Sequence, residues 1–199
     1  LTKLSVHAIG GLHSAFDHDN LSGFIRTQKE TLKQVIIGEG MSTTVYKSVF
    51  ALTKMDALSV SICRLPRDKS FYAQFAKNHN VRTIELRDYF DGDVEFLSNF
   101  LEVFPNVRSL ILRDTFGDMN NMVLLTARSL SKLESLSVGA FHESSFACAK
   151  CYKVKAVLVG YISRKIDYDQ LTKFQSRLSE LSIRVIYRTA FNNDNFGHQ

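Results

Sequence analysis

The chain repeats one short apolar pattern at a fixed distance along its length. The segments VRTIELRD, VRSLILRD and LESLSVGA begin at Val81, Val107 and Leu133, which are 26 residues apart. Each segment is apolar at its first, fourth and sixth positions, and weaker copies of this spacing begin at Leu1, Leu32, Met55, Val154 and Leu178. A period of about 20 to 30 residues indicates a chain that is built from stacked, similar units.

Helical patterns lie between the copies. After the segment at 81–88, Asp93 is a candidate N-cap, and Val94, Leu97 and Leu101 follow at spacings of three and four before Pro105 ends the run. Comparable patterns include the sets Leu21, Phe24 and Ile25; Val45, Val49 and Leu52; Phe71, Phe75 and Ala76; Met122, Leu125 and Leu130; and Tyr168, Leu171 and Phe174. The chain is therefore predicted to alternate a short strand with a helix of about three turns.

This alternation predicts an α/β fold with parallel strands, because each strand returns through a crossover helix. One unit cannot bury both of its faces, but stacked units can, with strands on a concave side and helices on a convex side. We expect residues 1–188 to form this array and residues 189–199, which are polar, to form a frayed tail. A doubly wound α/β domain is the alternative, although it does not explain the constant 26-residue offset.

The repeat spacing, together with the segment LSGFIRTQKETLKQVIIG from Leu21 to Gly38, resembles the leucine-rich-repeat domains of F-box proteins, particularly those of insects. The resemblance implies a solenoid of about seven or eight irregular repeats. It also implies a protein substrate on the concave face, and a Skp1-type adaptor of a cullin ubiquitin ligase that binds an F-box outside this chain. Regular repeats of the family often carry Asn or Cys where this chain has Tyr89, Thr115 and Phe141, so we expect irregular turns.

Strand periodicity also predicts which side chains face a partner. If Val81, Ile84 and Leu86 point inward, the concave side of three central strands carries Thr83, Glu85, Arg87, Ser109, Ile111, Arg113, Ser135, Ser137 and Gly139. The flanking strands add Gln34, Ile36, Ala57, Ser59, Ser61, Ala156, Leu158, Glu180 and Ser182. Arg87 and Arg113 would form a cationic ladder for an acidic or phosphorylated segment. Alternatively, they pair with Asp88 and Asp114 as ordinary surface ions.

The chemically reactive side chains do not assemble a catalytic or metal site. Cys148 and Cys151 form a C-x-x-C pair near His142, but a zinc site of this kind normally needs a second pair of ligands. His13 and His18, beside Asp17 and Asp19, fit a solvated loop between repeats. Because the chain has neither a nucleophile elbow nor a phosphate-binding loop, we expect no enzyme, no cofactor and no metal.

Composition narrows the class of partner. The net charge of +5 comes from scattered Lys and Arg residues, and the Phe residues fall mostly at core spacing on predicted helices, so nucleic acid is an improbable partner. No apolar run approaches the length of a membrane helix, and three cysteines fit the cytoplasm or nucleus. The sequence predicts a protein-binding module, and a non-ligase scaffold or inhibitor is the alternative. A module that binds RNA or a membrane surface is the third reading.

Overall fold

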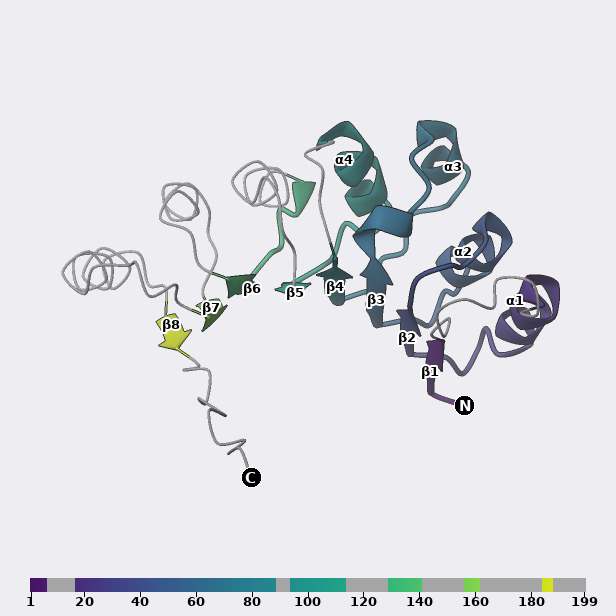
Figure 1. Cartoon of the computed structure of the whole chain (residues 1–199), viewed down its shortest axis with the longest axis horizontal. Helices are drawn as coiled ribbons and strands as arrows, with labels where there is room; N and C mark the ends of the chain where they lie inside the picture. Colours follow the sequence, from purple (N-terminus) through teal and green to yellow (C-terminus); the bar gives the residue numbers. More distant parts are fainter. Residues whose placement is uncertain (7–16, 89–93, 114–128, 141–155, 162–183, 188–199) are drawn as a thin grey trace, which may run out of the picture.

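The strands form one continuous parallel sheet. The computed structural model describes residues 1–6, 17–88, 94–113, 129–140, 156–161 and 184–187. Each strand in these ranges pairs in parallel with the strand that follows it along the chain (Figure 1). The strands are β1 (Lys3–Val6), β2 (Gln34–Ile37), β3 (Ala57–Ser61), β4 (Thr83–Arg87), β5 (Ser109–Arg113), β6 (Ser135–Ala140), β7 (Ala156–Tyr161) and β8 (Arg184–Tyr187).

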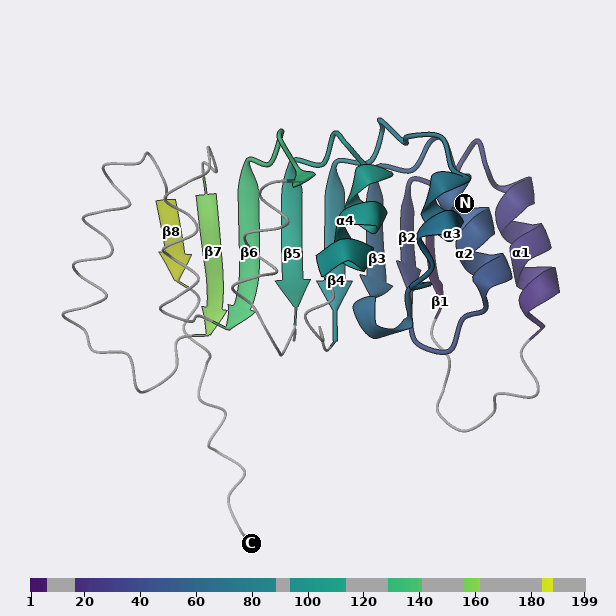
Figure 2. The ribbon, with the colours of Figure 1, turned by 90° about the horizontal axis from the view of Figure 1, so that it is seen from above.

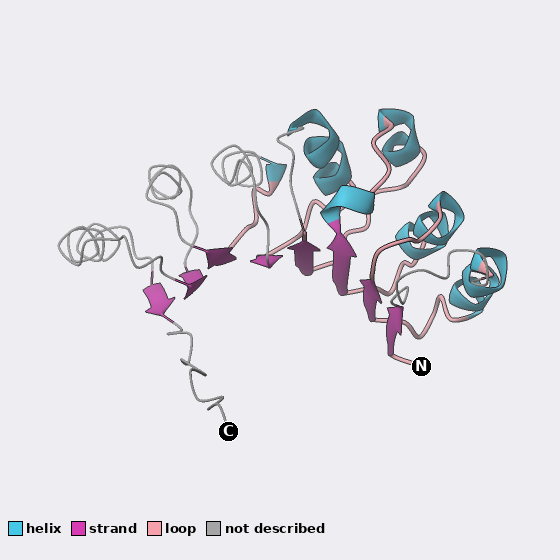
Figure 3. Cartoon of the chain, in the orientation of Figure 1, coloured by secondary structure: helices cyan, strands magenta, loops and turns pink. Residues whose placement is uncertain are grey.

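The described helices all cover the same face of this sheet. They are α1 (His18–Thr27), α2 (Thr43–Phe50), α3 (Lys69–Ala73) and α4 (Val94–Glu102), and a 3-10 turn, η1 (Ile62–Arg64), follows β3. The strands line the inner side of an arc and these helices lie outside it, as the views in Figures 1 and 2 and the colouring of Figure 3 show. The prediction of an α/β fold with an all-parallel sheet and helices is thus confirmed for the described residues.

The register of the three strongest repeats is the predicted one. Strands β4, β5 and β6 are consecutive neighbours, in which Ile84 pairs with Leu110 and Leu110 pairs with Leu136. Leu86 and Leu112 form the next buried row, and both are fully buried. The regular spacing of apolar residues in the sequence therefore becomes continuous apolar rows between the sheet and its helices.

The last strand differs from the prediction. The copy beginning at Leu178 was expected to place Glu180 and Ser182 in a strand, but β8 begins at Arg184, which pairs with Ala156. Residues 162–183 lie outside the described residues. The segment RVIY, in which this strand lies, is rich in β-branched and aromatic residues, which suit a strand.

Aspartate side chains cap the helices α1 and α3 at their amino ends. The Asp17 carboxylate accepts hydrogen bonds from the backbone N–H groups of Asp19 and Asn20, at 3.0 and 2.9 Å, and so caps α1. His18 and Asp19 therefore belong to a helix and not to the polar loop predicted for them, because Asp17 begins the helix. Asp68 caps α3 through the backbone N–H of Ser70. At five residues, α3 is shorter than the three turns predicted.

Several predicted features fall outside the described residues. These are the N-cap at Asp93, the helices predicted through Met122 and Leu125 and through Tyr168 and Leu171, and the tail at 189–199.

Aromatic rings fill the space between the helices. Phe50, at the end of α2, lies at the centre of this cluster and is almost completely buried. Its ring centroid lies 5.5 to 6.2 Å from those of Tyr46, Phe71, Tyr72, Phe75, Phe100 and Phe104. These distances are typical of stabilising aromatic pairs. The aromatic residues of α2, α3 and α4 thus form the core, as their helical spacing predicted.

The turns that lead into the strands repeat one hydrogen-bond pattern. In each, a single carbonyl accepts the backbone N–H groups of two successive residues in the next unit. For example, the Arg82 carbonyl accepts from Arg108 and Ser109, at 2.8 and 2.9 Å. The same arrangement recurs at the carbonyls of Thr2, Lys33, Asp56 and Arg108. The backbone geometry therefore repeats from β1 to β6, even where the sequence copies are weak.

Asparagine side chains connect the same turns. Asn78 donates to the Leu52 carbonyl at 2.7 Å, and Asn80 donates to the Thr53 carbonyl at 2.6 Å. In the next unit, Asn106 donates to the His79 carbonyl at 2.9 Å. The positions at which regular repeats of the resembled family carry Asn or Cys, here Tyr89, Thr115 and Phe141, lie outside the described residues. In the described part, side-chain amides link adjacent units at the amino-terminal edge of the sheet.

Candidate partner-binding face

The helix-free face of the sheet carries two aligned rows of side chains. In the first row, Thr83 pairs with Ser109 and Ser109 with Ser135, and in the second, Glu85 pairs with Ile111 and Ile111 with Ser137. The rows continue on the flanking strands through Gln34, Ile36, Ala57, Ser59, Ala156 and Leu158. The alignment predicted for these residues is confirmed in the register of the strands. Glu180 and Ser182 lie outside the described residues, and Arg184 and Ile186 of β8 occupy the register positions beside Ala156 and Leu158.

The exposure of this face changes along the sheet. Thr83, Glu85, Ser109 and Ile111 are half-buried, as are Ser135 and Ser137. On β3, Ser59 is only 6% exposed although it lies on the helix-free face, and the register places it between Ile36 and Glu85. Small hydroxyl side chains between larger neighbours leave the backbone of the central strands close to the surface, which favours contact with a closely approaching partner.

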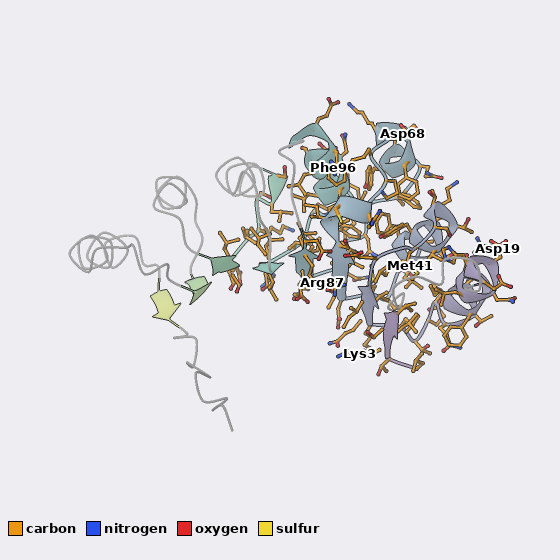
Figure 4. The ribbon with its side chains drawn as sticks, in the orientation of Figure 1. Lys3, Asp19, Met41, Asp68, Arg87 and Phe96 are labelled. Atoms are coloured by element: carbon orange, nitrogen blue, oxygen red, sulfur yellow. The ribbon has the colours of Figure 1, made fainter. Side chains whose placement is uncertain are left out.

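Arg87 does not stand free on this face. It pairs in register with Arg113, as predicted, and the side chain of Arg113 lies outside what the structure describes. Figure 4 labels Arg87 among the side chains of the sheet. Its Nη2 atom donates a hydrogen bond of 2.7 Å to the carbonyl oxygen of Ile37, two strands away. Its Nε atom is buried and has no hydrogen-bond partner among the described residues. The strand register thus agrees with the predicted cationic ladder, and a main-chain carbonyl accepts a hydrogen bond from the guanidinium of its Arg87 rung.

Charged and polar groups gather where β2, β3 and β4 end, which we call the carboxyl edge. Cys63 and Arg64 follow β3, and Asp88 follows β4 with a left-handed backbone φ of 73°. These residues and Arg87 all act electrostatically on Tyr46, which α2 supplies. Burial raises the pKa of the Tyr46 hydroxyl to about 12, the charges of Cys63 and Asp88 add to this rise, and Arg64 and Arg87 oppose it. In the sequence, Tyr46 stands among residues of the core, and no pattern there indicates that Tyr46 belongs to this edge.

The other candidate side chains either make contacts within the fold or lie outside the described residues. His18 accepts a hydrogen bond at Nδ1 from the backbone N–H of Ser42, at 3.0 Å, and so joins α1 to the start of α2. Cys63 is exposed, and its sulfur lies 3.2 Å from the Ser61 hydroxyl. His13, Cys148 and Cys151 lie outside the described residues. Within the described ranges, His, Cys, Asp and Glu side chains form no group of three or more that could hold a metal.

Comparison with known proteins adds no family to this description. The chain matches no protein-family model and no curated protein. Among the described residues, no helix has both the length and the apolar character needed to cross a membrane.

Proposed function

We propose that the chain is a leucine-rich-repeat solenoid that binds a protein on the helix-free face of its sheet. The observation that carries this proposal is the aligned register of Thr83, Ser109 and Ser135 beside Glu85, Ile111 and Ser137. Extended concave sheets of this kind offer a large binding surface. We assign partner binding to Thr83, Glu85, Ser109, Ile111, Ser135 and Ser137, with Arg87 and Arg113 at the border of the surface.

We further propose that the bound protein is the substrate of an F-box-type ubiquitin ligase in the cytoplasm or nucleus. The support for this step is the sequence resemblance of the repeats and of the segment from Leu21 to Gly38. The chain itself would act without catalysis, and a Skp1-type adaptor would bind an F-box outside it. A scaffold or inhibitor without a ligase partner shares the same concave surface, so the adaptor distinguishes the two functions.

The first experiment tests the class of partner. The full-length protein is captured from cells of its own organism, and the captured proteins are identified by mass spectrometry. Recovery of a Skp1-type adaptor and a cullin is expected. If partners are recovered reproducibly without a Skp1-type adaptor or a cullin, the ligase proposal fails, and the proposal of a scaffold or inhibitor remains.

The second experiment tests the binding face. Ser109→Arg and Ser135→Arg place bulky side chains in the first row. Each should weaken the binding of a recovered direct partner by at least tenfold, because small side chains at these half-buried positions otherwise leave the backbone close to the surface. Lys47→Glu is the matched control, since Lys47 is exposed on α2, on the other side of the sheet. Loss of binding in Lys47→Glu with full binding in both serine variants would contradict the assignment.

A further inference from the structure

The carboxyl edge holds two buried hydrogen-bond donors that have no acceptor among the described residues. Tyr46 is 1% exposed, and its hydroxyl has no partner there. Arg87 has five N–H donors, and its buried Nε atom is likewise without a partner. Buried polar groups in folded proteins are rarely left without a hydrogen bond, so two such donors that act on each other electrostatically need a physical explanation.

The chemistry of these donors identifies what could satisfy them. A guanidinium can only donate hydrogen bonds, and a tyrosine hydroxyl, which is protonated at neutral pH, can donate one as well. A group whose oxygens only accept hydrogen bonds complements both. A carboxylate and a phosphate have such oxygens and form charge-assisted bonds with a guanidinium.

A second guanidinium lies within reach of the same edge. Arg64 follows β3 on η1. Its charge, like that of Arg87, opposes the rise in the pKa of Tyr46 that burial causes. Its contact with Glu39 is loose, because the Arg64 nitrogen and the Glu39 oxygen are 3.9 Å apart and both side chains are more than half exposed. Such a pair is worth little energy, so Arg64 can turn toward another anion at small cost.

Arg87 can also change its acceptor. Its side chain is part-exposed, and its bond to Ile37 joins a charged donor to a neutral carbonyl. An anion offers the guanidinium two parallel charge-assisted bonds, which are stronger than the single bond to a carbonyl.

We propose that the carboxyl edge of β2, β3 and β4 binds an anionic group, a carboxylate or a phosphate, through Arg87, the Tyr46 hydroxyl and Arg64. Glu39 and Asp88 lie at the same edge and reduce the attraction, so we expect free anions to bind with dissociation constants of about 1–10 mM. This site shares Arg87 with the border of the protein-binding surface but uses none of the residues in its two rows, and it does not depend on the ligase proposal.

The test measures anion binding by the isolated chain. Sodium phosphate and sodium acetate are titrated at constant ionic strength, with sodium chloride as the balancing salt. Binding is followed by the melting temperature and by the Nε–H resonance of Arg87 in protein labelled with 15N-arginine. Saturable binding that moves the Arg87 resonance is expected. Tighter binding of phosphate than acetate would identify a phosphate site, and the reverse order would identify a carboxylate site.

Variants distinguish this site from general charge effects. Arg87→Met should weaken anion binding at least tenfold, and Tyr46→Phe and Arg64→Gln should each weaken it severalfold. Arg82→Met is the matched control, because Arg82 is exposed at the opposite edge of the sheet. This variant should bind anions as tightly as the parent chain. If Arg87→Met does not fold, anion binding by Tyr46→Phe and Arg64→Gln tests the proposal instead. The proposal is overturned if the response to both anions does not saturate. It is also overturned if Tyr46→Phe and Arg64→Gln bind anions as tightly as the parent chain.

Discussion

The Nη2 atom of Arg87 on β4 donates a 2.7 Å hydrogen bond to the carbonyl oxygen of Ile37 on β2, and so reaches across the intervening strand. Ser61, which pairs in register with Arg87 on that intervening strand, is only 1% exposed. The side chain therefore connects three strands at the carboxyl edge. A substitution at Arg87 changes stability as well as charge, and this coupling affects how any binding test at this position is interpreted.

Arg87→Met should reduce the free energy of unfolding by about 1–2 kcal/mol. The loss of a charged hydrogen bond accounts for this cost, and removal of the unpartnered Nε atom partly offsets it. Arg82→Met, at an exposed position, should cost less than about 0.5 kcal/mol. Urea unfolding of both variants measures the difference. Equal stability of the two variants would show that the bond to Ile37 contributes nothing in solution.

The double change Arg87→Glu and Arg113→Glu would for this reason be a poor test of partner binding alone, because it would also change stability. Ser109→Arg and Ser135→Arg provide a cleaner test of partner binding, because the side chains of these two serines form no hydrogen bond among the described residues.

Leu110→Ala should destabilise the protein by about 2–5 kcal/mol. Leu110 is fully buried between Ile84 and Leu136, so truncation leaves a cavity in a continuous apolar row. Ile111→Ala is the matched control, because Ile111 is the next residue, points to the helix-free face and is half-buried. It should cost about 1 kcal/mol or less. Denaturant unfolding checks both values, and a loss below roughly 0.5 kcal/mol for Leu110→Ala would contradict the observed register.

Asn78→Ala should cost about 1–3 kcal/mol. Asn78 is 7% exposed and donates from its side chain to the Leu52 carbonyl, so the change leaves a buried carbonyl without its donor. Asn99→Ala on α4 provides the control, because Asn99 is half-exposed and alanine favours the helix. Thermal unfolding should separate the two variants clearly. A melting temperature of Asn78→Ala that matches Asn99→Ala would mean that the asparagine bridges do not stabilise the turns.

Alkaline pH should destabilise the protein through Tyr46. Burial raises the pKa of Tyr46 from 10.0 to about 12, so between these values the folded state keeps a proton that the unfolded state has lost. The stabilisation from this group is complete below pH 10 and is lost as the pH rises through 12, to a total of at most about 2–3 kcal/mol. Burial raises the pKa of Tyr72 in the same direction.

Tyr46→Phe isolates this contribution. Its free energy of unfolding, measured by urea unfolding at intervals from pH 8 to pH 11.5, should fall less steeply above pH 10 than that of the parent chain. Tyr72 remains in both proteins and acts as an internal reference. Identical slopes for the two proteins would show that Tyr46 ionises as easily in the folded state as in the unfolded state.

Two regular features of the sequence were enough to predict much of the fold. The 26-residue offset of Val81, Val107 and Leu133 indicates equivalent strands, and the alternation of side chains along a strand assigns Leu110 to the core and Ser109 to the opposite face. Both features are local, because repeat spacing and strand periodicity do not depend on distant contacts. The rows on the helix-free face could therefore be predicted for all strands from β2 to β7.

The tertiary structure decided the features that depend on contacts between units. The strand that begins at Arg184 is defined by its pairing with β7, which apolar spacing does not report. The acceptor of Arg87 lies 50 residues earlier in the sequence, and it is a main-chain carbonyl, which every residue has. The Tyr46 hydroxyl acquires its raised pKa only because the folded chain buries it beside charges from two other units. Sequence periodicity determined the rows and their faces, whereas packing between units determined which polar groups in the described residues have partners.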